Sequence, residues 1–357
     1  MKKTALLYFA ASRPPYEQAG DVPSVIFYGT DKLREDPAFD LCVRWVRNPF
    51  LQLLCRPLET YLIARVHVGF RLDQALRHLW AIRRQEVILA ETDSTGLPLL
   101  LLKRLGFIRG RVGFISAGLI NELEAQQHTR LFAWYRWLLR AADFIVCWSP
   151  LEEALYRDLT GARARSVLLE ADTHFYQPDF QASLGDFVLC VGRDVGRDFQ
   201  TLFKALEALK IPAKVVTSRA RVQGLCVPGN VELVLNLVAY PTLLDWYRQA
   251  RLVVVSLQEV HRFTGQRALL EALAMGKATV VAKTLALTST YPLDDGREVV
   301  FYEPGDAQDL VQKIRALWQN EKQLASLGGA ARQAVDEIPE DSFYQGLRTL
   351  CAELSDD

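Results

Sequence analysis

Two stretches of this sequence combine residue types that could hold a phosphate. In the first, Val188–Leu202, an apolar run ends at Gly192, and Arg193 and Arg197 then lie on either side of Gly196. A guanidinium group stays protonated and can bind two phosphate oxygens at once, so two of them in one glycine turn suit a diphosphate. Two aspartates in the same turn leave a second interpretation open, in which the arginines only form salt bridges.

The second stretch, His261–Ala282, predicts a loop, a helix and a strand. Thr264 is suited to be the N-cap of the helix, and Gly265 lets the backbone turn without a Cβ penalty. Leucines and alanines then recur at three- and four-residue steps, Gly276 is placed for a left-handed helix end, and a buried strand follows. The N-terminus of such a helix presents free N–H groups and a positive dipole end, which favour a phosphate.

One carboxylate, Glu271, stands inside this apolar helix. In a helix it would lie roughly 9 Å from Gly265 along the helix axis, because each residue adds about 1.5 Å. This is close to the separation between the diphosphate and the ribose of a nucleotide. An ordinary amphipathic helix whose Glu271 faces solvent gives the same pattern, so the spacing leaves both interpretations open.

The composition is that of a soluble globular protein. The chain has 357 residues, 50% of them hydrophobic and 24% charged, with a formal net charge of zero. This length favours two domains, and a neutral chain has no general field that attracts nucleic acid. The six cysteines are scattered without a CxxC pair, which indicates free thiols in a reducing, cytoplasmic compartment. The first residues, MKKTALLYFAAS, imitate a signal peptide, but we interpret them as the first strand.

Strands and helices alternate along the chain, which predicts an α/β fold with parallel sheets. A stretch rich in Pro, Gly and polar residues, Phe175–Asp186, interrupts the alternation. We therefore predict an N-terminal, acceptor-side domain at 1–178, a nucleotide-sugar-binding domain at 179–338, and a C-terminal helix at 339–357 that returns to the first domain. Both domains are expected to be Rossmann-like and to face each other across a cleft, with ligands at the carboxyl ends of the strands. The predicted strands are Ala5–Ala10, Val25–Tyr28, Val87–Ala90, Val112–Ile115, Asp143–Cys147, Phe187–Val191, Lys214–Thr217, Val231–Leu235, Leu252–Ser256, Thr279–Val281 and Val299–Tyr302.

Taken together, the two stretches resemble the retaining GT-B glycosyltransferases, above all the large family 4 (glycosyltransferase group 1). The second domain has Gly192-Arg193, then Arg197, then LLEALAMGKATVVA, in the order found in that family. The later segment DDGREVVFYEPGDAQDLVQKI is similar to the family's sequence after the donor site, and RAADFIVCWSP and EADTHFYQP are similar to its approach to the interdomain linker. The resemblance covers nearly all of the second domain and the latter part of the first.

The resemblance implies a role for each matching residue. Arg193 and Arg197, next to Gly192, would hold the diphosphate of the donor and act in catalysis. Glu271 would accept hydrogen bonds from the ribose hydroxyls. The loop Thr264-Gly265-Gln266 would offer backbone N–H groups to the phosphate and to the transferred sugar.

Three departures from the family pattern bear on activity. Phe263 occupies the position of a second glutamate that the family usually has. Ser116-Ala117-Gly118 replaces a frequent His-Gly pair, and the N-terminal glycine-rich loop is reduced to Gly20. These losses leave the transferred sugar undefined. They also leave an alternative open, in which the chain is a catalytically inactive binding or scaffold protein of the same fold.

The implied reaction is metal-independent. The sequence contains no DxD triplet, and its five histidines include no pair four residues apart, so no metal site is predicted. The arginines and the helix dipole would instead neutralise the leaving diphosphate. We thus expect a retaining glycosyltransferase that uses no cofactor and moves a sugar from a nucleotide diphosphate sugar to a glycan, lipid or small-molecule acceptor.

The region Val43–Arg84 is aromatic and basic. It holds eight arginines and two acidic residues, a local net charge of 8 − 2 = +6. Basic residues mixed with Trp and Phe on helices can bind anionic lipid, so we expect peripheral contact with the inner face of a membrane. Packed helices with a solvated arginine face are the alternative. The aromatic residues of this region are Trp45, Phe50, Tyr61, Phe70 and Trp80.

Overall fold

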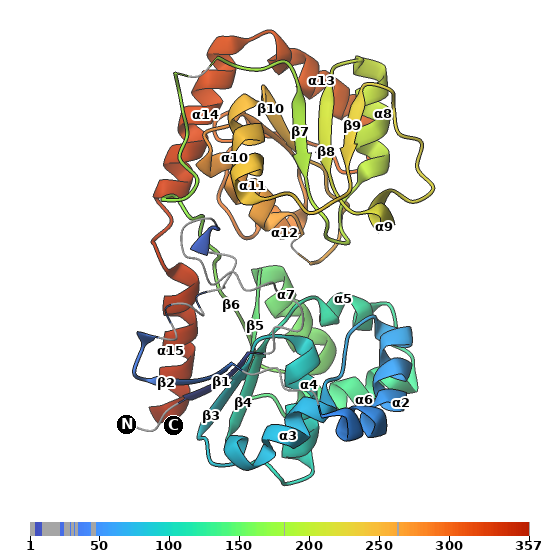
Figure 1. Cartoon of the computed structure of the whole chain (residues 1–357), viewed down its shortest axis with the longest axis vertical. Helices are drawn as coiled ribbons and strands as arrows, with labels where there is room; N and C mark the ends of the chain where they lie inside the picture. Colours follow the sequence, from blue (N-terminus) through green and yellow to red (C-terminus); the bar gives the residue numbers. More distant parts are fainter. Residues whose placement is uncertain are drawn as a thin grey trace. The chain divides into compact units, whose positions relative to one another are not determined.

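The computed structural model describes residues 4–8, 22–24, 29, 32, 35–43, 48–181, 183–262 and 264–356. These residues form two compact units, drawn in Figure 1. Unit 1 comprises the described residues of Met1–Tyr16, Phe27–Leu168 and Asp341–Asp357, and unit 2 those of Glu17–Ile26 and Leu169–Glu340. Each unit has its own parallel sheet, as the alternation of strands and helices predicts.

The sheet of unit 1 has the strand order β2-β1-β3-β4-β5-β6, and its neighbouring strands are all parallel. Its strands are β1 (Thr4–Tyr8), β2 (Phe39–Val43), β3 (Val87–Ala90), β4 (Arg111–Ile115), β5 (Phe144–Cys147) and β6 (Ala164–Ser166). Its helices are α2 (Pro49–Val66), α3 (Leu72–Ile82), α4 (Asp93–Arg104), α5 (Leu119–Glu124), α6 (Arg130–Leu139), α7 (Pro150–Leu155) with its π-helical continuation η2 (Tyr156–Thr160), and α15 (Ser342–Asp356).

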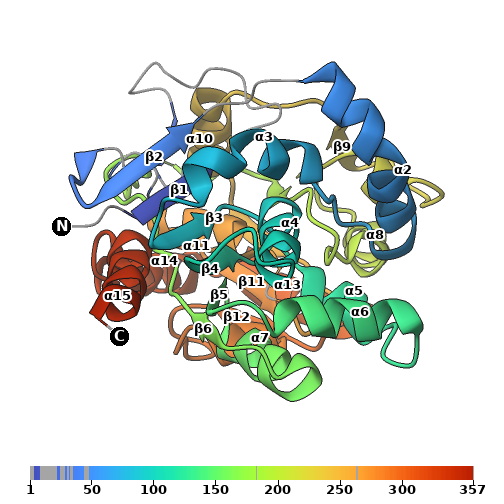
Figure 2. The ribbon, with the colours of Figure 1, turned by 90° about the horizontal axis from the view of Figure 1, so that it is seen from below.

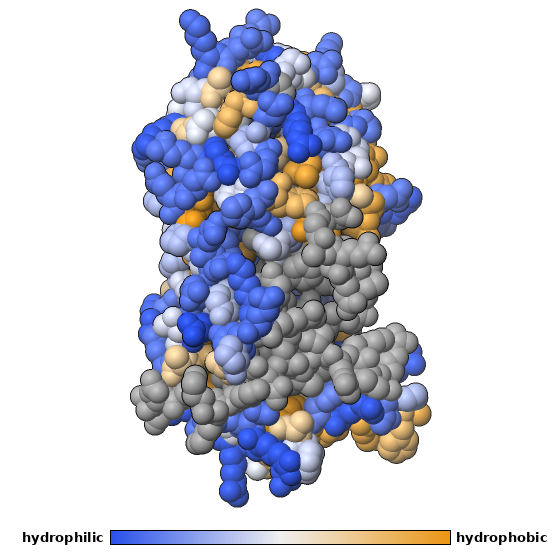
Figure 3. All heavy atoms as spheres, turned by 60° about the vertical axis from the view of Figure 1, so that its left-hand side comes forward, coloured by the Kyte–Doolittle hydropathy of each residue, from blue (hydrophilic) through white to orange (hydrophobic). Residues whose placement is uncertain are grey.

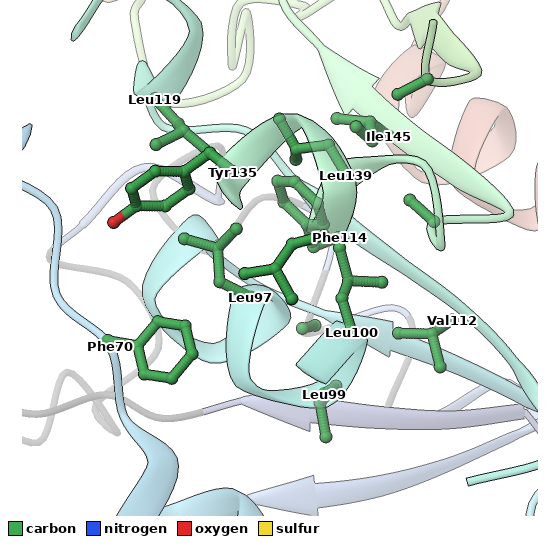
Figure 4. Packing of buried hydrophobic residues seen from close by; sticks show 14 of the residues in the cluster. Phe70, Leu97, Leu99, Leu100, Val112, Phe114, Leu119, Tyr135, Leu139 and Ile145 are labelled. Carbon is green, nitrogen blue, oxygen red and sulfur yellow. The ribbon is translucent and has the colours of Figure 1, made fainter. Parts of the chain in front are cut away.

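The core of unit 1 lies where α4 packs on β4. Figure 4 shows Leu97 and Leu100 of this helix beside Phe114, and all three side chains are fully buried. Gly96 allows the close approach, because a Cβ there would lie 2.4 Å from the Cβ of Phe114. Strands β3 and β5 are buried along their whole length, as expected of parallel strands covered by helices.

The sheet of unit 2 has the strand order β12-β11-β10-β7-β8-β9. Its strands are β7 (Val188–Val191), β8 (Ala213–Val216), β9 (Val231–Val234), β10 (Leu252–Val255), β11 (Thr279–Ala282) and β12 (Val300–Tyr302). Its helices are α8 (Phe199–Leu209), α9 (Arg219–Val222), α10 (Tyr240–Gln249), α11 (Gln266–Ala274), α12 (Leu285–Thr288), α13 (Ala307–Trp318) and α14 (Glu321–Asp336). The chain starts in the middle at β7, runs outward to β9 and returns to β10 beside β7. Parallel sheets bind ligands at such a topological switch point, outside the carboxyl ends of the two strands.

The sequence-based fold class is confirmed. All strands predicted for the second domain are present, with ends that differ by at most one residue. The short strand β6 and the edge strand β2 were not predicted. The expected strand Val25–Tyr28 and Gly20 lie outside the described residues. Of the cysteines whose side chains are described, all are free; Cys226 is exposed and the others are buried.

Helix α15 belongs to unit 1, as predicted for the C-terminal helix. The ring of Phe343 is fully buried and stacks on Trp148, with 5.2 Å between the ring centroids. At the next residue, the Tyr344 hydroxyl donates to Asp36 at 2.7 Å. Figure 2 shows the helix, in red, at the edge of the unit. The last residues of the chain thus complete the fold of the first unit.

We expect Phe343→Ala to lower the free energy of unfolding of unit 1 by about 3–5 kcal/mol, the range for deleting a buried aromatic ring. Urea denaturation followed by circular dichroism measures this change. Phe107→Ala is the matched control, because Phe107 is 56% exposed and its loss should change the free energy by less than about 0.5 kcal/mol. Equal unfolding midpoints for the two variants would contradict the structural role of α15.

Candidate functional site

The turn after β7 and the loop after β10 are joined at the switch point of unit 2. The N–H of Gln258 donates to the Gly196 carbonyl at 2.9 Å, and the N–H of Asp198 donates to the Ser256 carbonyl at 3.2 Å. The Ser256 hydroxyl donates to the Asp198 carbonyl at 2.7 Å. These bonds fix the backbone around Arg197 at the carboxyl ends of the two central strands.

Arg197 is buried against glycine backbone. Its side chain is packed so closely on Gly192 that a Cβ there would lie 2.2 Å from the guanidinium carbon, and a Cβ on Gly265 would lie 3.4 Å from the same atom. The Arg197 Nε donates to Asp194 at 2.9 Å. Its Nη1 is buried and has no hydrogen-bond partner among the described residues. A buried donor without a partner is costly, and it marks a place where a ligand oxygen would be bound.

The charge of Arg197 is secured by its surroundings. Burial on its own lowers the pKa of a guanidinium, but the carboxylate of Asp194, together with Cys190 and Tyr247, more than offsets this and leaves the pKa of Arg197 above its ordinary value. The ion pair with Asp194 uses the Nε–H of Arg197, and the Nη1 group remains without a hydrogen-bond partner among the described residues. The salt-bridge interpretation is therefore correct for Asp194, whereas Asp198 caps α8 by accepting from the N–H of Thr201 at 3.0 Å.

Helix α11 begins at Gln266, and its N-cap is Gly265 in the left-handed conformation with φ of 72°. The prediction of Thr264 as N-cap is wrong. The Thr264 hydroxyl points to the Gly196 carbonyl at 3.5 Å, because Gly196 lacks a Cβ and Thr264 packs into that space. Among the described residues no side chain caps α11, and its first turn holds no acidic residue. The first N–H groups and the positive dipole end are thus left for an anion.

Glu271 is buried, so the interpretation of a solvent-facing carboxylate is wrong. The hydroxyl of Tyr247, on α10, donates to Glu271 Oε2 at 3.1 Å. The pKa of Glu271 is raised, chiefly because burial disfavours its charge, although nearby Arg267 and Arg197 oppose the shift. Burial next to Glu271 in turn raises the pKa of Tyr247 well above its ordinary value.

The side chain of Gln266 serves the structure of the unit. Its Nε2 donates to the Tyr291 hydroxyl at 2.6 Å, and that hydroxyl donates to the Leu169 carbonyl at 2.8 Å. The residue following it, Arg267, donates to the hydroxyl of Tyr240 at 3.1 Å. Only the backbone of Gln266 therefore remains at the helix N-terminus for a ligand.

The structure brings together some of the predicted site residues. Gly192, Arg197, Thr264 and Gly265 are in mutual proximity around the guanidinium, and Glu271 follows on the same helix as Gly265. Arg193 is exposed and forms no hydrogen bond or ion pair with the part of the chain that the structure describes. Phe263, at the position of the family's second glutamate, lies outside the described residues.

Sequence reasoning missed the tyrosines around Glu271. Tyr247 lies 24 positions before Glu271, and Tyr176 comes from the segment that opens unit 2. The pKa of Tyr176 is raised by burial and by the charge of Glu271. The one available signal was that a lone carboxylate on an apolar helix face needs buried polar partners. Their positions depend on tertiary packing, which no local pattern encodes.

In unit 1, the loop Ser116-Ala117-Gly118 after β4 belongs to a buried network. The Ser116 hydroxyl and the Tyr156 hydroxyl lie 2.7 Å apart, and the N–H of Ala117 donates to Asp93 at 2.6 Å. Gly118 has φ of 117° and starts α5. Among the described residues, no group of three His, Cys, Asp or Glu side chains is placed to hold a metal ion.

Comparison with known proteins finds a family match within the second unit. Residues 187–320 match the family model described as "Glycosyl transferases group 1". This range contains the switch point, Arg197 and the whole of α11. No curated protein matches the sequence.

Solved structures match along the whole chain. The sucrose-phosphate synthase from Thermosynechococcus elongatus is 16% identical, with 99% of each chain covered and a TM-score of 0.71. The HepE protein of Anabaena, in complex with UDP-glucose, is 14% identical over 99% of this chain and 100% of its own, with a TM-score of 0.67. A UDP-forming α,α-trehalose-phosphate synthase from Burkholderia vietnamiensis is 10% identical over 100% of this chain and 99% of its own, with a TM-score of 0.67. At these identities the likeness shows the GT-B fold.

The burial of Glu271 predicts how stability depends on pH. Its folded pKa lies above the ordinary value of 4.5, so the folded state binds the proton more tightly than the unfolded state. The resulting contribution to stability is fully present below 4.5 and is lost as the pH rises through the folded pKa. Between about pH 5 and about pH 8, we therefore expect the wild type to lose stability relative to Glu271→Gln.

Chemical denaturation of both proteins across this pH range measures the difference. Glu337→Gln, at an exposed position, is the control and should run parallel to the wild type. A constant difference between the wild type and Glu271→Gln at all pH values would contradict the assignment of a raised pKa to this carboxyl.

Proposed function

We propose that this chain, a GT-B glycosyltransferase whose second unit is a group 1 domain, transfers a sugar from a nucleotide diphosphate sugar without a metal ion. The anomeric configuration is retained in the product, as the resemblance to family 4 implies. The donor binds at the switch point of unit 2. One observation carries the proposal: a charged guanidinium is buried there with an unpaired N–H edge, beside an uncapped helix N-terminus.

The diphosphate is the ligand that this geometry favours. Arg197 can donate to its oxygens through Nη1, and the first N–H groups of α11 supply further donors. As the glycosidic bond breaks, negative charge develops on the leaving diphosphate. Donors that are fixed before the reaction stabilise this charge without reorganisation, which is the largest electrostatic effect available to an enzyme. Arg193, exposed on the same turn, is proposed to close over the phosphate when the donor binds.

Glu271 is proposed to bind the ribose of the donor. Tyr247 donates to the Oε2 atom of this carboxylate, and we propose that the ribose hydroxyls donate to the same carboxylate. A carboxylate that is buried before the ligand arrives needs little further desolvation and makes strong charge-assisted hydrogen bonds. The titles of the similar structures name UDP-glucose as a bound ligand and a UDP-forming synthase. They support a uridine diphosphate sugar as the first donor to test.

A second candidate function is that of a non-catalytic binding protein with the same fold. Two observations favour it: Phe263 in place of a glutamate, and the engagement of Ser116 in a buried hydrogen-bond network. Such a protein would still bind a nucleotide at Arg197 and Glu271. Donor hydrolysis or transfer in a panel of UDP, GDP and ADP sugars distinguishes the enzyme from the binding protein.

Glu271→Gln should weaken nucleotide binding by about 1.5–3 kcal/mol, the range for a hydrogen bond to a charged group. Thermal-shift titration with UDP, GDP and ADP measures this change, because a ligand that binds the folded state raises its apparent stability. Glu337→Gln should bind like the wild type. An unaltered nucleotide affinity in Glu271→Gln would refute the ribose-binding role.

Turnover should survive excess EDTA, because arginine rather than a cation neutralises the leaving group. Replacing Arg197 or Arg193 by alanine should lower the turnover number by roughly 10²–10³-fold, the effect of losing one fixed electrostatic donor. Nucleoside binding without the diphosphate should change much less. Loss of turnover in EDTA, or normal turnover of both alanine variants, would contradict the metal-free arginine mechanism.

A further inference from the structure

Helix α2 presents an apolar surface to solvent. Only Cys55, Leu62 and Val66 of its 18 residues are buried, and they lie on one face. Phe50, Leu53 and Leu54 are 73, 69 and 65% exposed, and Tyr61 is 51% exposed. A helix on the surface of a soluble protein normally shows polar residues to water, so this side of α2 needs another explanation.

Five of the exposed apolar residues of α2 form one continuous stripe, which we call the α2 stripe, and Leu58 and Ile63, which are 36 and 43% exposed, lie outside it. The α2 stripe consists of Phe50, Leu53, Leu54, Pro57 and Tyr61. At about 100° per residue these positions occupy an arc of roughly 100°, centred opposite the buried face. The α2 stripe is therefore a second apolar face, and the core of unit 1 does not cover it.

The exposed charges of the segment 48–84 are all positive. The exposed charged side chains of this segment are those of Arg56, Arg65, Arg77, Arg83 and Arg84. Both acidic residues of this segment face inward instead. Glu59 lies 3.9 Å from Arg71, and Asp73, which is buried, lies 3.3 Å from the same arginine. The surface is thus complementary to an apolar partner with a negatively charged rim.

The neighbouring helix α3, which packs against α2, also exposes an aromatic residue. Trp80 is 64% exposed, and the guanidinium carbon of Arg84 lies 3.4 Å from its ring centroid. Exposed Trp and Tyr next to arginine are typical of membrane interfaces, where the ring lies at the level of the headgroups. By contrast, hydrophilic residues predominate among the described residues on the face shown in Figure 3.

We propose that the α2 stripe inserts into the surface of a bilayer that contains anionic lipids. The helix would lie in the plane of the membrane, its apolar side chains among the acyl chains and its arginines at the phosphates. None of the described helices is long and apolar enough to cross a membrane. The inference does not depend on the donor chemistry of unit 2.

A second copy of the chain fits this surface less well. In a symmetric dimer the same patch faces itself, so the arginines around one α2 stripe would face those of the other. Like charges brought together at an interface are unfavourable. An anionic bilayer instead attracts every exposed charge of the segment.

The structure changes which residues of Val43–Arg84 are expected to contact lipid. Phe70 is buried in the core of unit 1 and cannot contact lipid, and Trp45 lies outside the described residues. The composition of the region indicated an electrostatic contact through its arginines. The exposed leucines of α2 add an apolar contribution that salt does not screen.

Flotation with phosphatidylcholine vesicles, with and without phosphatidylglycerol, tests the proposal on the full-length protein. The wild type should bind the anionic vesicles, and high salt should weaken the binding but leave a measurable remainder. The double variant Leu53→Glu/Leu54→Glu should bind on the order of 100-fold more weakly, because it loses two apolar contacts and adds two repelled charges. Leu237→Glu, at an exposed leucine of unit 2, should bind like the wild type.

Three results would overturn the proposal: no binding of the wild type to anionic vesicles, equal binding by the double variant, or a wild-type dimer that the double variant dissociates in light scattering. Nucleotide thermal shifts of the double variant should equal those of the wild type, which separates this test from that of the donor site. Circular dichroism checks that the double variant is folded, as expected for two exposed positions.

Discussion

The candidate site depends on how the guanidinium of Arg197 packs on glycine backbone. Arg197 can be buried only because Gly192 has no side chain at the end of β7, and it keeps its charge only because Asp194 accepts its Nε–H. A buried charge is tolerated when it is paired and hydrogen-bonded. Here the pairing is incomplete, since Nη1 has no partner among the described residues. The protein thus holds a charged hydrogen-bond donor in a place from which water is largely excluded. Such a donor is stabilised when an anion binds to it.

Unit 2 stabilises two opposite charges at the two ends of one short helix segment. The positive group and the uncapped N–H groups lie at the start of α11, and the carboxylate of Glu271 lies further along the same helix. Burial works against both charges, and ionic or hydrogen-bonding partners hold each of them in position. A nucleotide diphosphate has complementary features at a similar spacing, with an anionic diphosphate at one end and a neutral diol at the other. The rigid helix sets this spacing.

The fold could largely be predicted from the sequence, and the position of the candidate site stays a prediction. The strands of unit 2 are short apolar runs between glycine turns, and such runs identify buried parallel strands. The motif around Arg197 and Glu271 placed the site at the ends of two of them. The Thr264 prediction failed because the close contact with Gly196 outweighed its preference for the N-cap. The tyrosines around Glu271 and the exposed stripe of α2 depend on which face of each helix packs inward, and tertiary contacts decide that.

The assignment of α15 to unit 1 has a consequence for how the protein is made. Leu169–Glu340 lies between the parts of the chain that build unit 1, and Phe343 follows it. During synthesis, the sequence of unit 2 is therefore complete before Phe343 can reach its partner Trp148. Unit 1 must wait with this part of its core uncovered, although most of its sequence is translated first. Domains usually fold from the N-terminus onward, and here the second unit can finish before the first.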